Sequence, residues 1–418
     1  MLYSKIQLKY KSSSLYFYFL FIIFSVILFN YSCTPTKRIE KVDKKYLLDK
    51  NENVRVLLTE SVNNIIRLKN VSKILDNFGR TIPIKSNSDV QFSFTSNGIK
   101  CIVDGNEFFS KEFTVFPKNL FNISFNDKEY RGYFKIKANS SSFMLVNYVD
   151  IENYTKGVIL KEMPLGKGKE NFEAIKAFSI LVRTYSLKRK LESKELFDLY
   201  SDTRDQIYGG VSSESEITNN LVDQTRGQFL FFNKDIASCF YHSTCGDYTE
   251  NVENVFKSEP LPYLVSIKDN NPSNCNISPR FNWSEQFSKD LIIRRLVEAN
   301  YITDKNSKLN SIEIVSRFKS GRVNQLKITI IENKKIKEVS LFSNNIRFVL
   351  KNAKGNILPS TNFEISQTSE NIKFNGKGFG HGVGLCQWGS IKLSKDGKNF
   401  KEILNFYFPK TEIKKLYD

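Results

Sequence analysis

Short runs of β-branched and aromatic residues follow one another from Asn53 to about Ala138, and they constrain the fold more than any other feature. Asn, Gly, Asp and Ser separate the runs, as is usual where turns join neighbouring strands. The sequence therefore predicts a β-rich N-terminal region over residues 51–140, with strands at VRVLLT (54–59), IIRLK (65–69), VQFSFT (90–95), IKCIVD (99–104), NISF (122–125) and YFKIKA (133–138).

A single long amphipathic helix is predicted from about Asn171 to Lys190. Its apolar residues recur every three or four positions and so share one buried face, which carries Phe172, Ile175, Phe178, Val182 and Tyr185. Asn171 is a suitable N-cap, and the basic residues at the other end complement the helix dipole. We expect this helix to lie in the core of a domain over residues 141–280.

Residues 281–370 have the pattern of an inserted α/β region, with one helix over 288–300 and strands such as 310–318 and 325–333. The last part of the chain, residues 371–418, begins with a glycine-rich run and is expected to return and complete the core. The predicted fold class is α+β: mixed β-sheets, one long core helix, a β-rich N-terminal region and an inserted α/β region.

The N-terminus has the composition of an export leader over residues 1–32. A lysine-bearing start precedes an apolar run over 15–29, which is short for a membrane span of about 20 residues. Ser32 directly before Cys33 resembles a lipoprotein processing site, in which Cys33 becomes the lipidated N-terminus. An uncleaved anchor and ordinary signal cleavage are the alternatives. All three predict a protein of the cell envelope, held to a membrane or released from it, with a polar tether over residues 33–50.

The chain is strongly basic, with a formal net charge of +18, and 40% of its residues are hydrophobic. The hydrophobic fraction supports a packed core and argues against wholesale disorder. The basic residues are spread along the sequence, often near Asp or Glu, which is typical of a solvated surface. Zinc-finger, RRM and helix-turn-helix signatures do not stand out, so no nucleic-acid partner is expected.

Glu162 is the first candidate for chemistry, within Lys161-Glu162-Met163-Pro164. We place it at the end of an apolar strand and ahead of the long helix, on a turn that the proline restrains. A half-buried carboxyl there has a raised pKa and suits a general acid. The alternative is an ordinary surface glutamate.

Lys176 and Arg183 are seven residues apart on the predicted helix and so lie on the same face, two turns from each other. Two cations there could orient the carboxylate or hold an acidic substituent of a sugar. The alternative is that they form a solvated flank of the helix.

A group of cysteine and histidine residues is the third candidate: Cys239-x-x-His242-x-x-Cys245, with Cys275 thirty residues on. These spacings suit zinc. Alternation along a strand would place Cys239 and His242 on opposite faces, which leaves His242, Cys245 and Cys275 as the better trio. A Cys245–Cys275 disulfide competes with zinc in an oxidising compartment, and free thiols are the third possibility.

The glycine-rich segment GKGFGHGVGLCQWG (376–389) is the fourth candidate. It matches neither the P-loop nor the dinucleotide fingerprint, which argues against nucleotide binding. Six glycines around His381 indicate a tight backbone path that another group approaches closely. Gln387 and Trp388 follow, and aromatic rings commonly stack on sugars, so we expect His381, Gln387 and Trp388 to bind substrate. The alternative is a buried structural loop.

Taken in order, these segments resemble the SpoIID/LytB family over nearly all of residues 50–415. The stretches that carry the resemblance are YRGYFKIK (130–137), LVNYVDIENYTKGVILKEMP (145–164), EAIKAFSILVRTYSL (173–187), YGG (208–210), DQTRGQFL (223–230), YHSTCGDYTE (241–250), LPYLVSI (261–267), SGRV (320–323), LPSTNFEI (358–365) and GKGFGHGVGLCQWGS (376–390).

The resemblance implies a lytic transglycosylase that cuts peptidoglycan glycan strands lacking stem peptides. Its acid/base would be the glutamate of the EMP motif, here Glu162, with Arg183 and Lys176 close by. Some members hold zinc near the site through His and Cys, and His242 and Cys245 fall in the comparable segment. This chain departs from the common YHSTSGG form at Cys245 and Asp247, which supports a metal or disulfide particular to this branch.

Other family members are amidase enhancers, which bind the cell wall and stimulate a separate amidase. The same fold and cleft would serve that role, so the resemblance leaves an enzyme and a non-catalytic wall-binding protein as alternatives. The partners implied are peptidoglycan strands, a membrane through the lipid anchor, and for an enhancer a cell-wall amidase.

Overall fold

The computed structural model describes residues 53–61, 65–85, 88–118, 122–139 and 141–418. The predicted leader (1–32), the predicted tether (33–50) and Cys33 lie outside the described residues. Within the described ranges, no helix combines the length and apolar character needed to cross a membrane. Helices and mixed β-sheets occur together, which confirms the α+β class.

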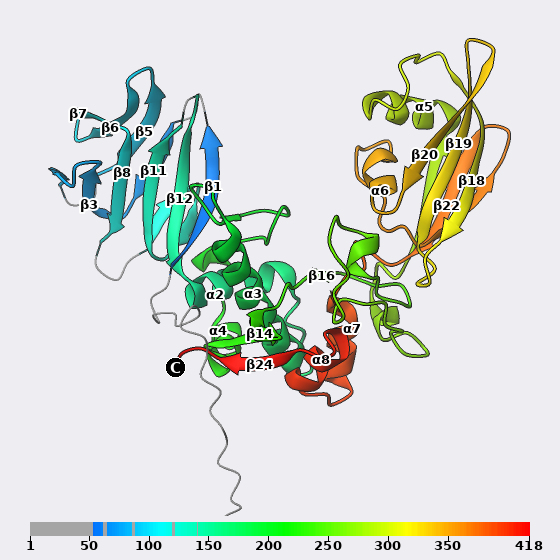
Figure 1. Cartoon of the computed structure of the whole chain (residues 1–418). Helices are drawn as coiled ribbons and strands as arrows, with labels where there is room; N and C mark the ends of the chain where they lie inside the picture. Colours follow the sequence, from blue (N-terminus) through cyan, green and yellow to red (C-terminus); the bar gives the residue numbers. More distant parts are fainter. Residues whose placement is uncertain (1–52, 62–64, 86–87, 119–121, 140) are drawn as a thin grey trace, which may run out of the picture. The chain divides into compact units, whose positions relative to one another are not determined.

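Two sheets form the N-terminal part, in blue and cyan in Figure 1. The first has the strand order β13 (Leu199–Tyr200), β1 (Asn53–Ser61), β12 (Phe143–Asp150), β11 (Tyr133–Ala138), β8 (Glu112–Pro117), β3 (Val71–Asp76) and β4 (Thr81–Ile82). The second has the order β10 (Lys128–Tyr130), β9 (Ile123–Phe125), β2 (Ile66–Lys69), β5 (Val90–Thr95), β6 (Gly98–Val103) and β7 (Asn106–Ser110). Phe92 of one sheet contacts Phe113 of the other with ring centroids 5.6 Å apart, and both are fully buried, so apolar faces of the two sheets meet in one core.

The predicted long helix is α3 (Phe172–Glu192), which is buried along most of its length. It packs against α2 (Ile151–Glu162) and α4 (Glu216–Gln224). Asn171 occupies the N-cap position, but its side chain makes no capping hydrogen bond and instead donates to the Pro164 carbonyl at 2.9 Å. The residue therefore fixes the loop between α2 and α3 rather than the helix end.

The inserted region has its own hydrophobic core, built between residues 287 and 374. It contains the sheet β18 (Lys308–Arg317), β19 (Val323–Glu332) and β20 (Lys335–Phe342), the sheet β17 (Asn282–Ser288), β22 (Asn371–Lys377) and β21 (Phe363–Gln367), and the helices α5 (Lys289–Glu298) and α6 (Asn345–Val349). Ser288 caps α5 by accepting from the Leu291 amide at 3.2 Å.

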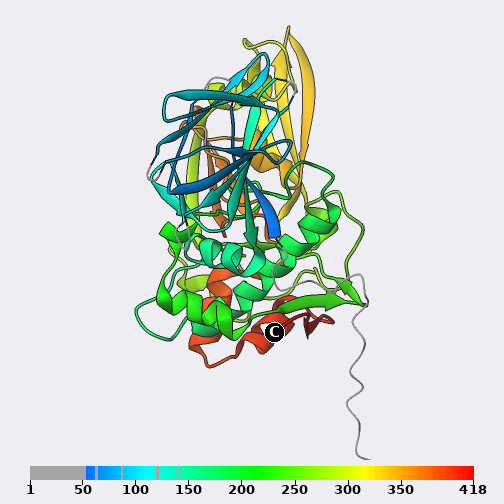
Figure 2. The same cartoon turned by 90° about the vertical axis from the view of Figure 1, so that its left-hand side faces the viewer.

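The C-terminal segment returns to the helical core. Strand β24 (Glu412–Lys415) pairs with β14 (Gln228–Phe232), and β23 (Leu385–Cys386) pairs with β16 (Tyr241–His242). Helices α7 (Gln387–Lys395) and α8 (Phe400–Tyr407) pack on α3, where Figures 1 and 2 show them in red beside the green helices. The glycine-rich run thus leads directly from the inserted region into the core.

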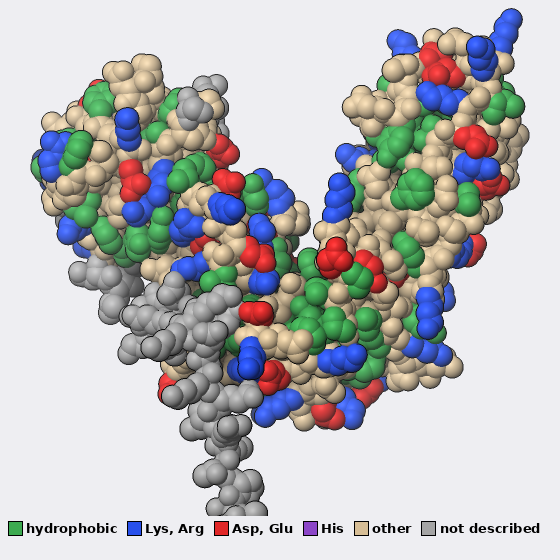
Figure 3. Space-filling model, viewed as in Figure 1, with side chains coloured by type: hydrophobic (Ala, Val, Ile, Leu, Met, Phe, Trp, Pro, Cys, Tyr) green, Lys and Arg blue, Asp and Glu red, His purple; other side chains and the backbone are tan. Residues whose placement is uncertain are grey.

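Lysine and arginine side chains are scattered over the face seen in Figure 3, with Asp and Glu between them. This agrees with their spread along the sequence.

Candidate functional site

Glu162 is the last residue of α2, so the prediction that it follows a strand was wrong. The apolar segment 142–160 divides at Asp150, whose side chain accepts from the Asn153 amide at 3.0 Å and caps α2. Strand β12 ends there and the helix begins. Two residues after Glu162 comes Pro164, and the backbone turns away toward α3.

Glu162 is half-buried, and two hydrogen bonds hold it, one at the side chain and one at the main chain. Its Oε1 accepts from the Ile207 amide at 2.8 Å, and its main-chain carbonyl accepts from Gln387 Nε2 at 2.9 Å. Burial raises the pKa of Glu162 above its usual range, and hydrogen bonds from Ile207, Tyr241 and Gln387 only partly oppose that rise. A carboxyl with a raised pKa can hold a proton and deliver it to a bound molecule.

A cavity of about 330 Å³ opens beside Glu162. Aromatic side chains and a few polar groups surround it, with the lining formed by Glu162, Tyr185, Thr203, Arg204, Asp205, Ile207, Cys239, Phe240, Tyr241, Phe256 and His381. Apolar walls with a small number of polar groups are typical of a site for an organic ligand.

His381, for which the sequence predicts substrate binding, lines this cavity. Its Nδ1 accepts from the Val383 amide at 3.0 Å, and its ring lies against Phe256 with centroids 5.2 Å apart. Burial, followed by the nearby His242, lowers the pKa of His381 well below its usual range, so the imidazole is neutral. A neutral His381 can offer its ring to a sugar without adding charge to the cavity.

Gln387 and Trp388, the other predicted substrate contacts, do not line the cavity. Gln387 is buried and acts on Glu162 through the main-chain hydrogen bond already described. The Trp388 amide donates to the Ser243 carbonyl at 3.1 Å, and its side chain is half-buried. Gln387 is therefore a positioning residue for the glutamate.

Asp205 lies in the same cavity, although its sequence position gave no indication of this. Its Oδ1 accepts from the Tyr185 hydroxyl and lies 3.2 Å from Arg189 Nε, while its Oδ2 accepts from the Tyr200 amide at 2.8 Å. Both oxygens are thus engaged by the protein. Asp202, by contrast, pairs with Arg204.

Arg183 is fully buried and pairs with Glu152 at 2.8 Å. It also donates to Thr225 Oγ1 at 3.1 Å and to the Val222 carbonyl at 2.7 Å. Lys176 pairs with Glu173 at 2.7 Å, and neither cation lines the cavity beside Glu162. The structure therefore gives Arg183 and Lys176 partners other than the candidate acid.

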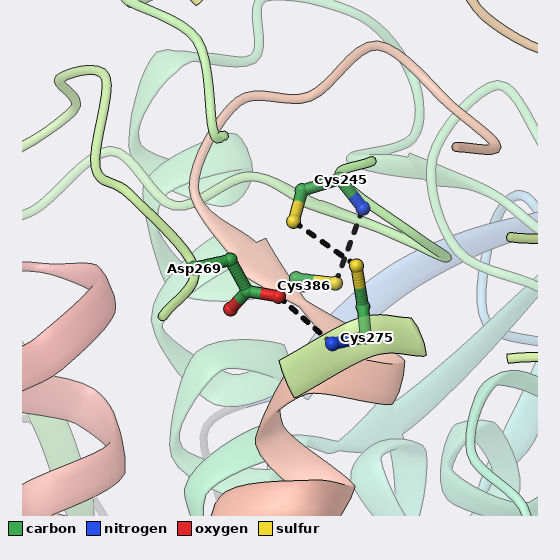
Figure 4. A group of neighbouring side chains, drawn as sticks. All are labelled: Cys245, Asp269, Cys275 and Cys386. Atoms are coloured by element: carbon green, nitrogen blue, oxygen red, sulfur yellow. Dashed lines mark hydrogen bonds between the residues drawn. The ribbon is translucent and has the colours of Figure 1, made fainter. Parts of the chain in front are cut away.

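The predicted metal trio comes together only in part. The sulfurs of Cys245 and Cys275 lie 3.3 Å apart, but His242 Nδ1 instead donates to the Val383 carbonyl at 3.1 Å. Asp269 and Cys386 join the two cysteines instead, as Figure 4 shows. Among the described cysteines none forms a disulfide.

Sequence reasoning missed Asp269 and Cys386 for different reasons. Cys386 lies in the glycine-rich run, where the sequence pointed to His381, Gln387 and Trp388 instead, although it pairs with His242 across β16 and β23. Asp269 carries no local signal, because its role depends on contacts made by the loop before Cys275.

A family model described as "Stage II sporulation protein" (SpoIID) matches residues 139–232, which include Glu162 and Arg183. A second model, a domain of unknown function (DUF8618), matches residues 271–384. The inserted region thus coincides largely with a domain that has its own family model.

Similar curated proteins include an uncharacterised protein of Brachyspira hyodysenteriae, 32% identical over 293 residues, with 70% of this chain and 74% of that protein covered. The "Amidase enhancer" of Bacillus subtilis is 26% identical over 302 residues, covering 62% of this chain and 40% of that protein. "Stage II sporulation protein D" of the same organism is 26% identical over 286 residues, covering 64% and 75%. With the SpoIID model and these relatives, the chain belongs to the SpoIID/LytB family.

Proposed function

We propose that this protein is a peptidoglycan lytic transglycosylase with Glu162 as its single acid/base. The observation that supports this most is the position of the Glu162 carboxyl, which is half-buried at a cavity and has a raised pKa. The protein would act in the cell envelope, on glycan strands that lack stem peptides. Lipidation of Cys33 would hold it to a membrane there.

In the proposed reaction, protonated Glu162 gives its proton to the oxygen that links N-acetylmuramic acid to N-acetylglucosamine. The bond from C1 to that oxygen breaks through an oxocarbenium-like state. The Glu162 carboxylate then takes the proton from the C6 hydroxyl, whose oxygen bonds to C1. The products are a 1,6-anhydro end and a free hydroxyl, and Glu162 is protonated again without water being consumed.

The cavity suits a mechanism with one carboxyl. The Ile207 amide holds Oε1 of Glu162 at 2.8 Å, and Tyr241 and Gln387 also act on this carboxyl from the protein side. Asp205 is the other carboxyl in the lining, and both its oxygens are engaged by Tyr185, Arg189 and Tyr200. A hydrolase with two carboxyl groups needs the second to activate water or attack the sugar. Because both of its oxygens are already engaged, Asp205 is not available to activate water or to attack the sugar.

The decisive experiment incubates the purified full-length chain, in a mild detergent, with glycan strands stripped of stem peptides. Mass spectrometry of the wild-type products should find anhydro-muramyl ends. Glu162→Gln keeps the oxygen that accepts from Ile207 but removes the proton donor, and should lower the rate by about 10²–10⁴-fold. Glu192→Gln, at the exposed end of α3, is the matched control and should react as wild type.

Hydrolysed reducing ends in place of anhydro ends would refute the transglycosylase. Unchanged strands, bound equally by wild type and Glu162→Gln, would favour the second candidate, an amidase enhancer. Its support is the similarity to the Bacillus subtilis protein of that name. In that case addition of either variant should increase the release of stem peptides by a cell-wall amidase.

A further inference from the structure

Four buried side chains with metal-binding atoms meet away from the Glu162 cavity: Cys245, Asp269, Cys275 and Cys386. Their sulfur and carboxylate atoms all lie within 4.8 Å of one another. The residues come from the loop after β16, the loop before the short helix η4 (Asn274–Ile277), η4 itself and the end of β23. Figure 4 shows the three sulfurs and the carboxylate pointing toward one another.

The spacing of these atoms fits a small tetrahedral ion. Thiolates bound to zinc at about 2.3 Å lie about 3.7 Å from each other in a tetrahedron. The sulfurs of Cys245 and Cys275 are 3.3 Å apart, and the remaining pairs stay within 4.8 Å. Movements of about 1 Å or less would therefore suffice to seat the ion.

Hydrogen bonds from the surrounding protein already orient the donor atoms. Cys386 Sγ accepts from the amides of Cys245 at 3.3 Å and Gly389 at 3.4 Å. Asp269 accepts from the Cys275 amide at 2.9 Å and from the Tyr407 hydroxyl at 2.8 Å. Such outer contacts are typical of metal sites, where they fix ligand orientation.

A compensating positive charge lies next to the cluster. Arg322 is fully buried, and its Nη2 donates to the Cys245 carbonyl at 2.9 Å. Three thiolates and one carboxylate around a divalent ion carry a net negative charge, which is costly to bury without a cation nearby. The guanidinium of Arg322 reduces that cost.

We propose that Cys245, Asp269, Cys275 and Cys386 bind one zinc ion in a closed, structural site. Three soft sulfur donors select zinc over calcium or magnesium, which take oxygen ligands. Four protein ligands leave no open position for a water or substrate, so the site is structural and not catalytic. This donor set replaces His242 of the predicted trio with Asp269 and Cys386.

The ion would join segments that are far apart in sequence and would hold the start of α7. Cys386 is the N-cap of α7, and the next residue, Gln387, bonds to the main chain of Glu162. The metal site therefore lies one residue from a contact that positions the candidate acid. Its existence does not depend on the proposed function, because an amidase enhancer could contain the same site.

The experiment measures metal content of the full-length chain purified under reducing conditions. Elemental analysis should find one zinc ion per chain. Replacement of zinc by cobalt should give the intense visible absorption of a tetrahedral cobalt–thiolate centre. Cys386→Ser should abolish both signals, whereas Cys101→Ser, at a buried cysteine in β6, should leave them unchanged.

A milder variant distinguishes loss of metal binding from loss of the fold. Tyr407→Phe removes only the hydroxyl that donates to Asp269 and should weaken cobalt binding by about 10–100-fold while the chain stays folded. A reduced wild-type chain that takes up neither zinc nor cobalt would overturn the proposal. Recovery of a Cys245–Cys275 disulfide from protein isolated without reductant, with no bound metal, would also overturn it and assign the pair a cross-linking role.

Discussion

At the scale of single residues, Glu162 depends on partners that its own motif does not contain. The amide that holds its side chain belongs to Ile207, 45 residues later, and the amide that holds its main chain belongs to Gln387, 225 residues later. The glutamate itself is recognisable from the EMP sequence. Its raised pKa is not, because burial by these distant segments produces it.

The raised pKa of Glu162 predicts a pH-dependent cost to stability. The folded chain binds the carboxyl proton more tightly than the unfolded chain, in which a glutamate titrates near about 4.3. The stabilisation of the fold by the protonated Glu162 carboxyl is complete below the unfolded pKa. It is lost as pH rises through the folded pKa. Glu162→Gln cannot lose a proton, so it should melt at a higher temperature than wild type at pH 7.

The same comparison at pH 4 supplies the internal control. The difference in melting temperature between Glu162→Gln and wild type should shrink there, because both side chains are then neutral. A difference that stays constant from pH 4 to pH 7 would mean that the carboxyl does not carry an elevated pKa.

At the scale of helices and strands, α3 illustrates what periodicity can and cannot predict. The apolar spacing predicted the position of α3, but not its burial on every side from Ala177 to Thr184. The seven-residue spacing places Lys176 and Arg183 on a shared face. It does not identify their partners. Arg183 pairs with Glu152 on α2, and Lys176 pairs with Glu173 one turn away. Pairing between helices depends on packing that a single helical pattern does not contain.

Arg183 should therefore matter for stability before it matters for chemistry. Arg183→Met leaves Glu152 buried without its cation and should destabilise the chain by about 3–5 kcal/mol in denaturant unfolding. Lys176→Met breaks a partly exposed pair and should cost about 0–1 kcal/mol. Adding Glu152→Met to Arg183→Met should recover most of the loss. A fully stable Arg183→Met chain with no activity would instead point to a direct catalytic role.

At the scale of the whole molecule, the α+β class followed from the sequence, but the contacts that join the inserted region to the rest of the chain did not. Strand β22 extends the inserted region to Lys377, because it pairs with β17 across roughly ninety residues of chain. The junction also depends on single side chains: Ser320 donates to Glu250, and Asn362 Nδ2 donates to the Gly246 carbonyl at 2.9 Å. No local pattern reveals such contacts.

Arg322 is the central contact of this junction and gives the last prediction. Its guanidinium donates to the carbonyls of Cys245 at 2.9 Å and Gly380 at 3.2 Å. Arg322→Leu should leave both carbonyls unsatisfied, at about 1–3 kcal/mol each. Hydrogen exchange measured by mass spectrometry should then accelerate over residues 376–384.

The matched control for Arg322→Leu is Arg294→Leu on the exposed face of α5, which should leave exchange over residues 376–384 unchanged. Faster exchange only within the inserted region would show that Arg322 supports that region's own fold. Faster exchange that includes Gly380 is the result expected if Arg322 joins the insertion to the glycine-rich segment beside Glu162. Because His381 lines the cavity, loss of this contact should also weaken glycan binding.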